Sequence, residues 1–154
     1  MIALGIDAAT KTGWAIVERT GGRETLRGHG ILKLNTPHVW NPIAWLALQA
    51  RPWGGPWPDV VAIELPFLGQ NPHTLEVLAR ICGRFEQAFG PSGANIRVIR
   101  SNQWQPKMLG PTRMKRAMLK KLAVAWCRSN LGAVLPQDAA DAAVLAVYSL
   151  RFPA

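Results

Sequence analysis

The chain contains little cysteine and histidine, and this shortage excludes several kinds of site. Its 154 residues include two cysteines and three histidines. No Cys/His pair has the spacing of metal ligands, so a zinc-type centre is not indicated. Both cysteines, Cys82 and Cys127, fall on apolar faces of predicted helices. We interpret them as small buried residues in a reducing cytosol.

Long hydrophobic runs are also missing. No stretch approaches the roughly 20 apolar residues that a transmembrane helix needs. The short apolar run at the N-terminus meets Asp7 too early for a signal peptide. Apolar residues still make up 49% of the chain, too many for a disordered polymer. We therefore expect a cytoplasmic protein with one α/β domain over residues 1–154 and no membrane partner.

Acidic residues are scarce, and their positions are informative. The chain has nine Asp and Glu residues against 18 Lys and Arg, for a net charge of +9. Four of the nine lie in or beside apolar segments: Asp7, Glu64, Asp138 and Asp141. Setting these aside leaves 18 basic residues against five acidic ones. A basic surface around a small acidic spot favours nucleic acid as the partner, with an anionic membrane or a merely basic soluble protein as the alternatives.

The hydrophobic pattern predicts an alternation of strands and helices. Apolar runs predict strands over 2–7, 13–18, 24–34, 59–64 and 95–100, with a hairpin turn at 20–23, so that the first three strands are antiparallel. Helical spacing and end signals predict helices over 41–51, 72–90, 112–131 and 136–151, and a short turn or helix from Ser101. A loop rich in proline, glycine and tryptophan over 52–58 separates the first helix from the fourth strand, and its Trp53 and Trp57 suit either a stacking platform or an interface.

The four segregated acids are placed where a metal-dependent active site would need them. Asp7 and Glu64 each end an apolar strand, and parallel neighbouring strands would bring both to one edge of the sheet. Asp138 and Asp141 share one face of the last helix, whose alanines allow a close approach to the sheet. Clustered carboxylates repel one another unless cations lie between them, and an all-oxygen donor set favours Mg²⁺ or Mn²⁺. Two such ions would suit hydrolysis of a phosphodiester.

Three segments resemble the motifs of RuvC Holliday junction resolvases, in the RNase H-like nuclease superfamily: residues 4–15, Ile63-Glu64 and Asp138–Ala142. The match spans almost the whole chain, although Ala8-Ala9 stand where the family commonly has Pro-Gly. The resemblance implies a five-stranded mixed sheet of order 3-2-1-4-5 flanked by helices. It implies that Asp7, Glu64, Asp138 and Asp141 are catalytic, metal-binding acids that hold Mg²⁺, with two ions per site and Mn²⁺ as a substitute.

The same resemblance implies a homodimer that makes paired symmetric nicks in four-way DNA junctions, with residues 72–90 as the candidate interface. It also supplies DNA-contacting candidates, of which Phe67 has a structural alternative as a core residue under a loop. Arg113, Arg116 and Lys120 share a face of the predicted long helix that is either a DNA-tracking surface or simply solvated. The full set of DNA-binding candidates is Phe67, Lys11, Asn71, Lys107, Arg113, Lys115, Arg116 and Lys120.

Other functions remain open from the sequence. The acids define a metal site but not the shape of the substrate, so a broader nuclease for flaps or other branched DNA is an alternative. A catalytically silent junction-binding protein is another. The actin-like or sugar-kinase superfamily shares an Asp followed by Gly after its first strand, but it needs two domains and a second phosphate loop. A bacterial host and a phage-infected cell fit equally well.

Overall fold

The computed structural model describes residues 1–34, 43, 44, 46, 57–65, 71–110 and 115–153. The predicted helix over 41–51 and the loop over 52–58 lie largely outside these residues. Phe67 and Arg113 lie outside them entirely, as does the side chain of Arg116. Among the described residues, no helix is both long enough and apolar enough to cross a membrane.

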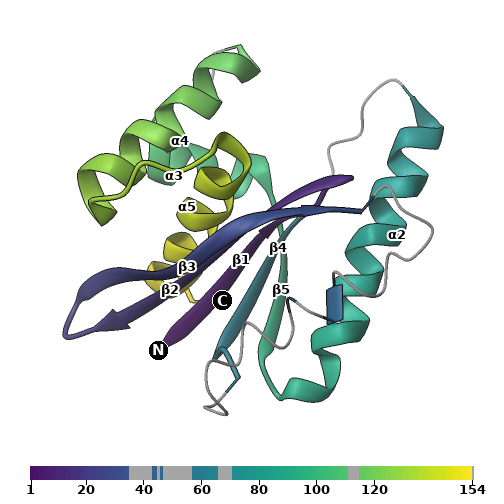
Figure 1. Cartoon of the computed structure of the whole chain (residues 1–154), viewed down its shortest axis with the longest axis horizontal. Coiled ribbons are helices and arrows are strands. Elements are labelled where there is room, and N and C mark those ends of the chain that lie inside the picture. Colours follow the sequence, from purple (N-terminus) through teal and green to yellow (C-terminus); the bar gives the residue numbers. More distant parts are fainter. Residues whose placement is uncertain (35–42, 45, 47–56, 66–70, 111–114, 154) are drawn as a thin grey trace.

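Five strands form one mixed sheet, as predicted from the resemblance. They are β1 (Ile2–Asp7), β2 (Lys11–Thr20), β3 (Arg23–Lys33), β4 (Val60–Leu65) and β5 (Asn95–Arg100). Their spatial order is β3-β2-β1-β4-β5. The first three strands pair antiparallel, whereas β1 with β4 and β4 with β5 pair parallel. The predicted α/β class and sheet order are therefore confirmed (Figure 1).

The hairpin between β2 and β3 follows from two glycines. Gly21 and Gly22 have φ angles of 59° and 81°, a left-handed conformation that other residues adopt with strain. Two consecutive positive φ values match the twist of antiparallel strands and close the hairpin in two residues. The turn predicted at 20–23 is confirmed, although β2 begins at Lys11, two residues earlier than expected.

In the described part of the chain, four longer helices connect and cover the sheet. They are α2 (Pro72–Phe89), α3 (Ser101–Leu109), α4 (Arg116–Leu131) and α5 (Gln137–Arg151), with a short 3-10 turn η2 (Gly90–Ser92) after α2. Asn71 caps α2, because its side-chain oxygen accepts from the backbone N–H groups of His73 and Thr74. The expected start of α4 at Thr112 is wrong, since Lys115 has extended backbone at φ −61° and ψ 143° and the helix begins after it. Gly132 ends α4 at φ 66° as predicted.

The sheet is covered on both faces (Figure 1). Large side chains, among them Leu4 and Ile63, point toward α2, where they pack with Phe85 and Phe89. Trp57 belongs to this layer, since its ring meets Phe89 edge-on at 6.1 Å between ring centroids, and it is partly buried rather than a free platform. Small side chains point to the other face, toward α5, which is buried almost along its whole length. Small residues on both partners allow α5 to lie close to the sheet, and α3 and α4 pack outside it.

Candidate active site

Asp7 and Glu64, the two acids at strand ends, lie side by side on the face of the sheet that α5 covers. The parallel register pairs Ile6 of β1 with Ile63 of β4, so that Asp7 and Glu64 follow at the same level. Glu64 lies opposite Ile99 of β5, whose side chain packs in the α5-side core. Paired residues on neighbouring strands point to the same face. The juxtaposition of Asp7 and Glu64 that the sequence suggested therefore exists, on the α5 face.

Two glycines, Gly5 and Gly13, allow the start of α5, which carries Asp138 and Asp141, to approach the strand ends closely. Gly13 pairs with Asp7 across β1 and β2. A Cβ atom built on Gly13 would lie 2.0 Å from the backbone oxygen of Asp138. A Cβ on Gly5 would lie 1.9 Å from the backbone oxygen of Ala142, next to Asp141. Only glycine permits such approach, so the first turns of α5 rest directly on β1 and β2, with Asp138 and Asp141 above the strand ends.

Two lysines surround Asp138. The Lys120 ammonium donates to Asp138 Oδ1 at 2.6 Å, and Lys11 Nζ lies 3.5 Å from Asp138 Oδ2. Lys11 is 64% exposed in its side chain, whereas Lys120 is 24% exposed. Both carboxylate oxygens of Asp138 therefore have a cationic neighbour, and α4 and β2 each contribute one of these neighbours to the site.

The pKa values of this pair shift in opposite directions. Burial is the largest influence on the pKa of Asp138 and raises it, but the hydrogen bond and charge of Lys120 together with the charge of Lys11 outweigh burial and lower the pKa. Burial likewise acts to lower the pKa of Lys120. The hydrogen bond with Asp138 and the charges of Asp138, Asp141 and Asp7 outweigh it and raise that pKa. Three of the four acids, Asp138, Asp141 and Asp7, thus stabilise the charged form of Lys120.

The four acids suit a hard divalent cation, because all of their donor atoms are carboxylate oxygens and because all four lie on the α5 side of the sheet. Carboxylate oxygens are the ligands that Mg²⁺ and Mn²⁺ prefer. As the side chains stand, however, no three His, Cys, Asp or Glu residues in the described part of the chain are grouped closely enough to hold a metal ion. Asp138 is directed to Lys120 instead.

The structure separates the other predicted DNA-binding residues. Lys107 lies over the rings of Phe152 and Tyr148, at 4.8 and 5.8 Å from their centroids. Tyr148 is ten residues along α5 from Asp138, or about 15 Å at 1.5 Å per residue, so Lys107 stands at the far end of that helix. Asn71 is occupied as the cap of α2. Lys115 is exposed just before α4, the helix that carries Lys120.

Sequence reasoning missed two features of the site. One is the contact role of Gly5 and Gly13, for which the only sequence signal was glycine inside a strand. The other is Lys33, which pairs directly with Lys11 across β2 and β3 and is exposed. Two like charges opposite one another on a sheet are unfavourable in the absence of an anion. Lys33 therefore extends the basic border of the acid cluster.

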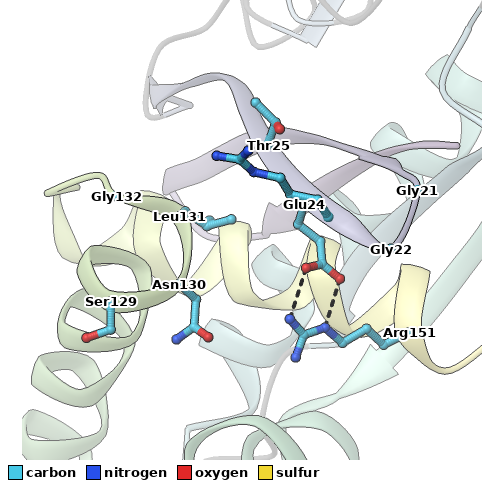
Figure 2. Close-up of a pocket in the computed structure, with 10 residues that line it drawn as sticks. Gly21, Gly22, Glu24, Thr25, Ser129, Asn130, Leu131, Gly132 and Arg151 are labelled. Carbon is cyan, nitrogen blue, oxygen red and sulfur yellow. Dashed lines mark hydrogen bonds and ion pairs between the residues drawn. The ribbon is translucent and has the colours of Figure 1, made fainter.

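A pocket of about 670 Å³ lies at the other end of the sheet, between the β2–β3 turn and the last turns of α4 and α5. Figure 2 shows Glu24 and Arg151 meeting across it. Arg151 donates to the two carboxylate oxygens of Glu24 at 2.9 and 3.0 Å. This hydrogen bonding, against the effect of burial, lowers the pKa of Glu24. The pair ties α5 to β3.

The sheet order, the helix on each face and the acids at the ends of β1 and β4 define an RNase H-like α/β fold. No protein-family profile matches the chain. The crossover junction endodeoxyribonuclease RuvC of Pseudoalteromonas atlantica is 23% identical over 154 residues, covering 95% of this chain and 84% of that protein. The RuvC structure of Thermus thermophilus has a TM-score of 0.76 at 20% identity and covers 98% of this chain and 96% of its own. The fowlpox virus Holliday junction resolvase has a TM-score of 0.66 at 14% identity, covering 98% of both chains.

The fold is therefore the RuvC-like version of the RNase H fold. The resemblance to RuvC-type resolvases that the sequence motifs indicated is confirmed, by a sequence relative and by structures from a bacterium and a virus.

Proposed function

We propose that this protein is a Holliday junction resolvase, an endodeoxyribonuclease that cuts four-way DNA junctions by paired symmetric nicks. The observation that carries the proposal is the placement of Asp7 and Glu64 at the ends of adjacent parallel strands, on the face against which the first turns of α5, with Asp138 and Asp141, are packed. Similar structures support the choice of substrate, since the T. thermophilus RuvC and the fowlpox virus resolvase are both known in complex with Holliday junctions.

We assign Asp7, Glu64, Asp138 and Asp141 as the residues that would hold Mg²⁺, with two ions per site and Mn²⁺ as a substitute. When bound, such ions supply a water nucleophile of lowered pKa and stabilise the leaving oxygen. The chain itself supplies the frame: β1 and β4 fix two acids, and α5 fixes the others against Gly5 and Gly13. We assign Lys11, which is mostly exposed beside Asp138, to contact the phosphate of the strand to be cut.

DNA binding is assigned to the basic residues that border the acids. Lys11 and Lys33 at the ends of β2 and β3 form one side of this border. Lys115, exposed just before α4, forms the other. Binding through phosphates releases counterions and therefore weakens as the salt concentration rises. A homodimer would carry two such sites and give paired nicks, and α2, with its partly exposed outer face, remains our candidate for the interface.

Cleavage of a labelled immobile four-way junction and of linear duplex DNA tests the proposal, with Mg²⁺, Mn²⁺ or EDTA. The Asp7→Asn variant is the control, because it keeps the size of the side chain and removes its charge. We expect metal-dependent paired nicks in the junction and a loss of at least about 10²-fold in the variant, the scale of removing a major electrostatic contact in a catalytic site.

Each alternative function has its own outcome in this assay. Equal cutting of junctions, flaps and linear duplex would replace the resolvase by a broader nuclease. Binding of the junction without cleavage under any metal would leave a catalytically silent junction-binding protein.

A further inference from the structure

Lys120 is held in the acid cluster by the packing of α4. Ala123 and Cys127, three and seven residues further along α4, are fully buried against α5. Cys127 also lies with its sulfur 3.7 Å from the backbone oxygen of Ala140. Residues at this spacing share one face of a helix, so the buried face of α4 continues to Lys120. The Lys120 side chain is thereby directed at Asp138 rather than toward solvent.

Lys120 contacts an oxygen of one of the proposed metal ligands. Its ammonium lies 2.6 Å from Asp138 Oδ1, while the other oxygen of that carboxylate faces Lys11. A carboxylate that accepts a hydrogen bond from an ammonium group has that lone pair unavailable for a metal ion.

We propose that Lys120 is a built-in counter-cation of the acid cluster and that it competes with divalent metal ions for Asp138. In the metal-free protein it neutralises part of the repulsion among the four carboxylates. A metal ion that binds to Asp138 displaces the Lys120 ammonium, so that Lys120 lowers the affinity of the site for metal. This inference rests on the proposed metal site and assigns to one residue the control of its occupancy.

Metal binding in the absence of DNA tests the inference without reference to cleavage. Mn²⁺ is titrated calorimetrically into the wild-type protein, Lys120→Met and Lys120→Arg. Lys121→Met is the matched control, because it removes the same charge from the next residue of α4, which is exposed. Methionine fills the half-buried position of Lys120 without a charge, and circular dichroism and a thermal melt verify that each variant is folded.

We expect Lys120→Met to bind Mn²⁺ about tenfold more tightly than the wild type, because a positive charge near a divalent ion is removed. Lys120→Arg should stay near the wild-type affinity, and Lys121→Met within about twofold, because its charge is screened by solvent. Should Lys120→Met fail to fold, Lys120→Gln takes its place. In an Asp138→Asn background the effect of Lys120→Met should largely disappear, because the contested carboxylate is gone.

The outcomes distinguish this inference from the proposed function. An unchanged or weaker affinity in Lys120→Met, with good binding in the wild type, overturns the competition and leaves the metal site standing. Binding in Lys120→Met but not in the wild type supports the competition in its strongest form. Absence of binding in every variant overturns both the competition and the metal site.

Discussion

Replacing Gly13 with alanine is expected to displace the start of α5 and to disable the site without touching any acid. A Cβ atom at this position would lie 2.0 Å from the backbone oxygen of Asp138, 2.2 Å from its carbonyl carbon and 2.7 Å from the nitrogen of Ala139. Cβ atoms do not approach other atoms closer than 3.0 Å, and backbone cannot rotate away as a side chain can. The first turn of α5 must therefore move by about 1 Å relative to the sheet.

The magnitude follows from this displacement. Forcing extra volume into a well-packed interface costs about 1–3 kcal/mol of unfolding free energy. A misplacement of about 1 Å in an active site can reduce the rate about 10²-fold. Urea denaturation measures the first effect, and the rate of junction cleavage under single-turnover conditions measures the second.

Gly28→Ala provides the control. A Cβ atom on Gly28 would lie 3.5 Å from the nearest atom of the Trp14 ring, an ordinary van der Waals distance, and the residue lies inside β3. Alanine there should change the stability by no more than about 1 kcal/mol and leave the cleavage rate unchanged. If Gly13→Ala had the stability and the cleavage rate of the wild type, the close contact between α5 and β2 would not be the element that positions Asp138.

Three further predictions concern other parts of the molecule. Because the pKa of Glu24 in the folded protein is held below its ordinary value of 4.5 by Arg151, the contribution of this pair is fully present above pH 4.5 and is lost as the pH falls through the lowered pKa. Urea denaturation of Glu24→Gln should therefore show a smaller loss of stability than the wild type across this acidic range, and an equal loss would contradict the assignment. Lys33→Ala should weaken junction binding and reduce the salt slope by about one unit, as measured by fluorescence anisotropy at several salt concentrations; an unchanged slope would place Lys33 outside the DNA surface. The thiols of Cys82 and Cys127 are buried and burial raises the pKa of each to about 12, so a thiol reagent should label them only after unfolding, and rapid labelling of the native protein would refute this.

The elements of this fold could be predicted because their boundaries are set by local chemistry. Gly21 and Gly22 close a hairpin, Asn71 caps a helix and Gly132 ends one, each through backbone geometry or a hydrogen bond within a few residues. The start of α4 was misjudged because Thr112 offers a good cap, whereas the backbone of Lys115 is extended. A residue that can cap a helix makes a helix start possible at that position, but it does not fix the start there.

The four acids could also be recognised in the sequence, since a carboxylate at the end of an apolar strand is conspicuous. Periodicity placed Asp138 and Asp141 on one helix face, and the small residues of α5 anticipated its close approach to the sheet. The sequence thus determined which residues carry the charge of the proposed site and which strands present two of them.

Only the tertiary structure decided which basic residues surround these acids. Lys107 and Lys120 were equal candidates in the sequence, yet one lies over aromatic rings at the far end of α5 and the other on Asp138. Lys33 became visible only through its pairing with Lys11. The physical reason is that periodicity fixes the face of a helix or strand on which a side chain lies. The partner of that face depends on how distant segments pack, and here on two glycines that set α5 against the sheet.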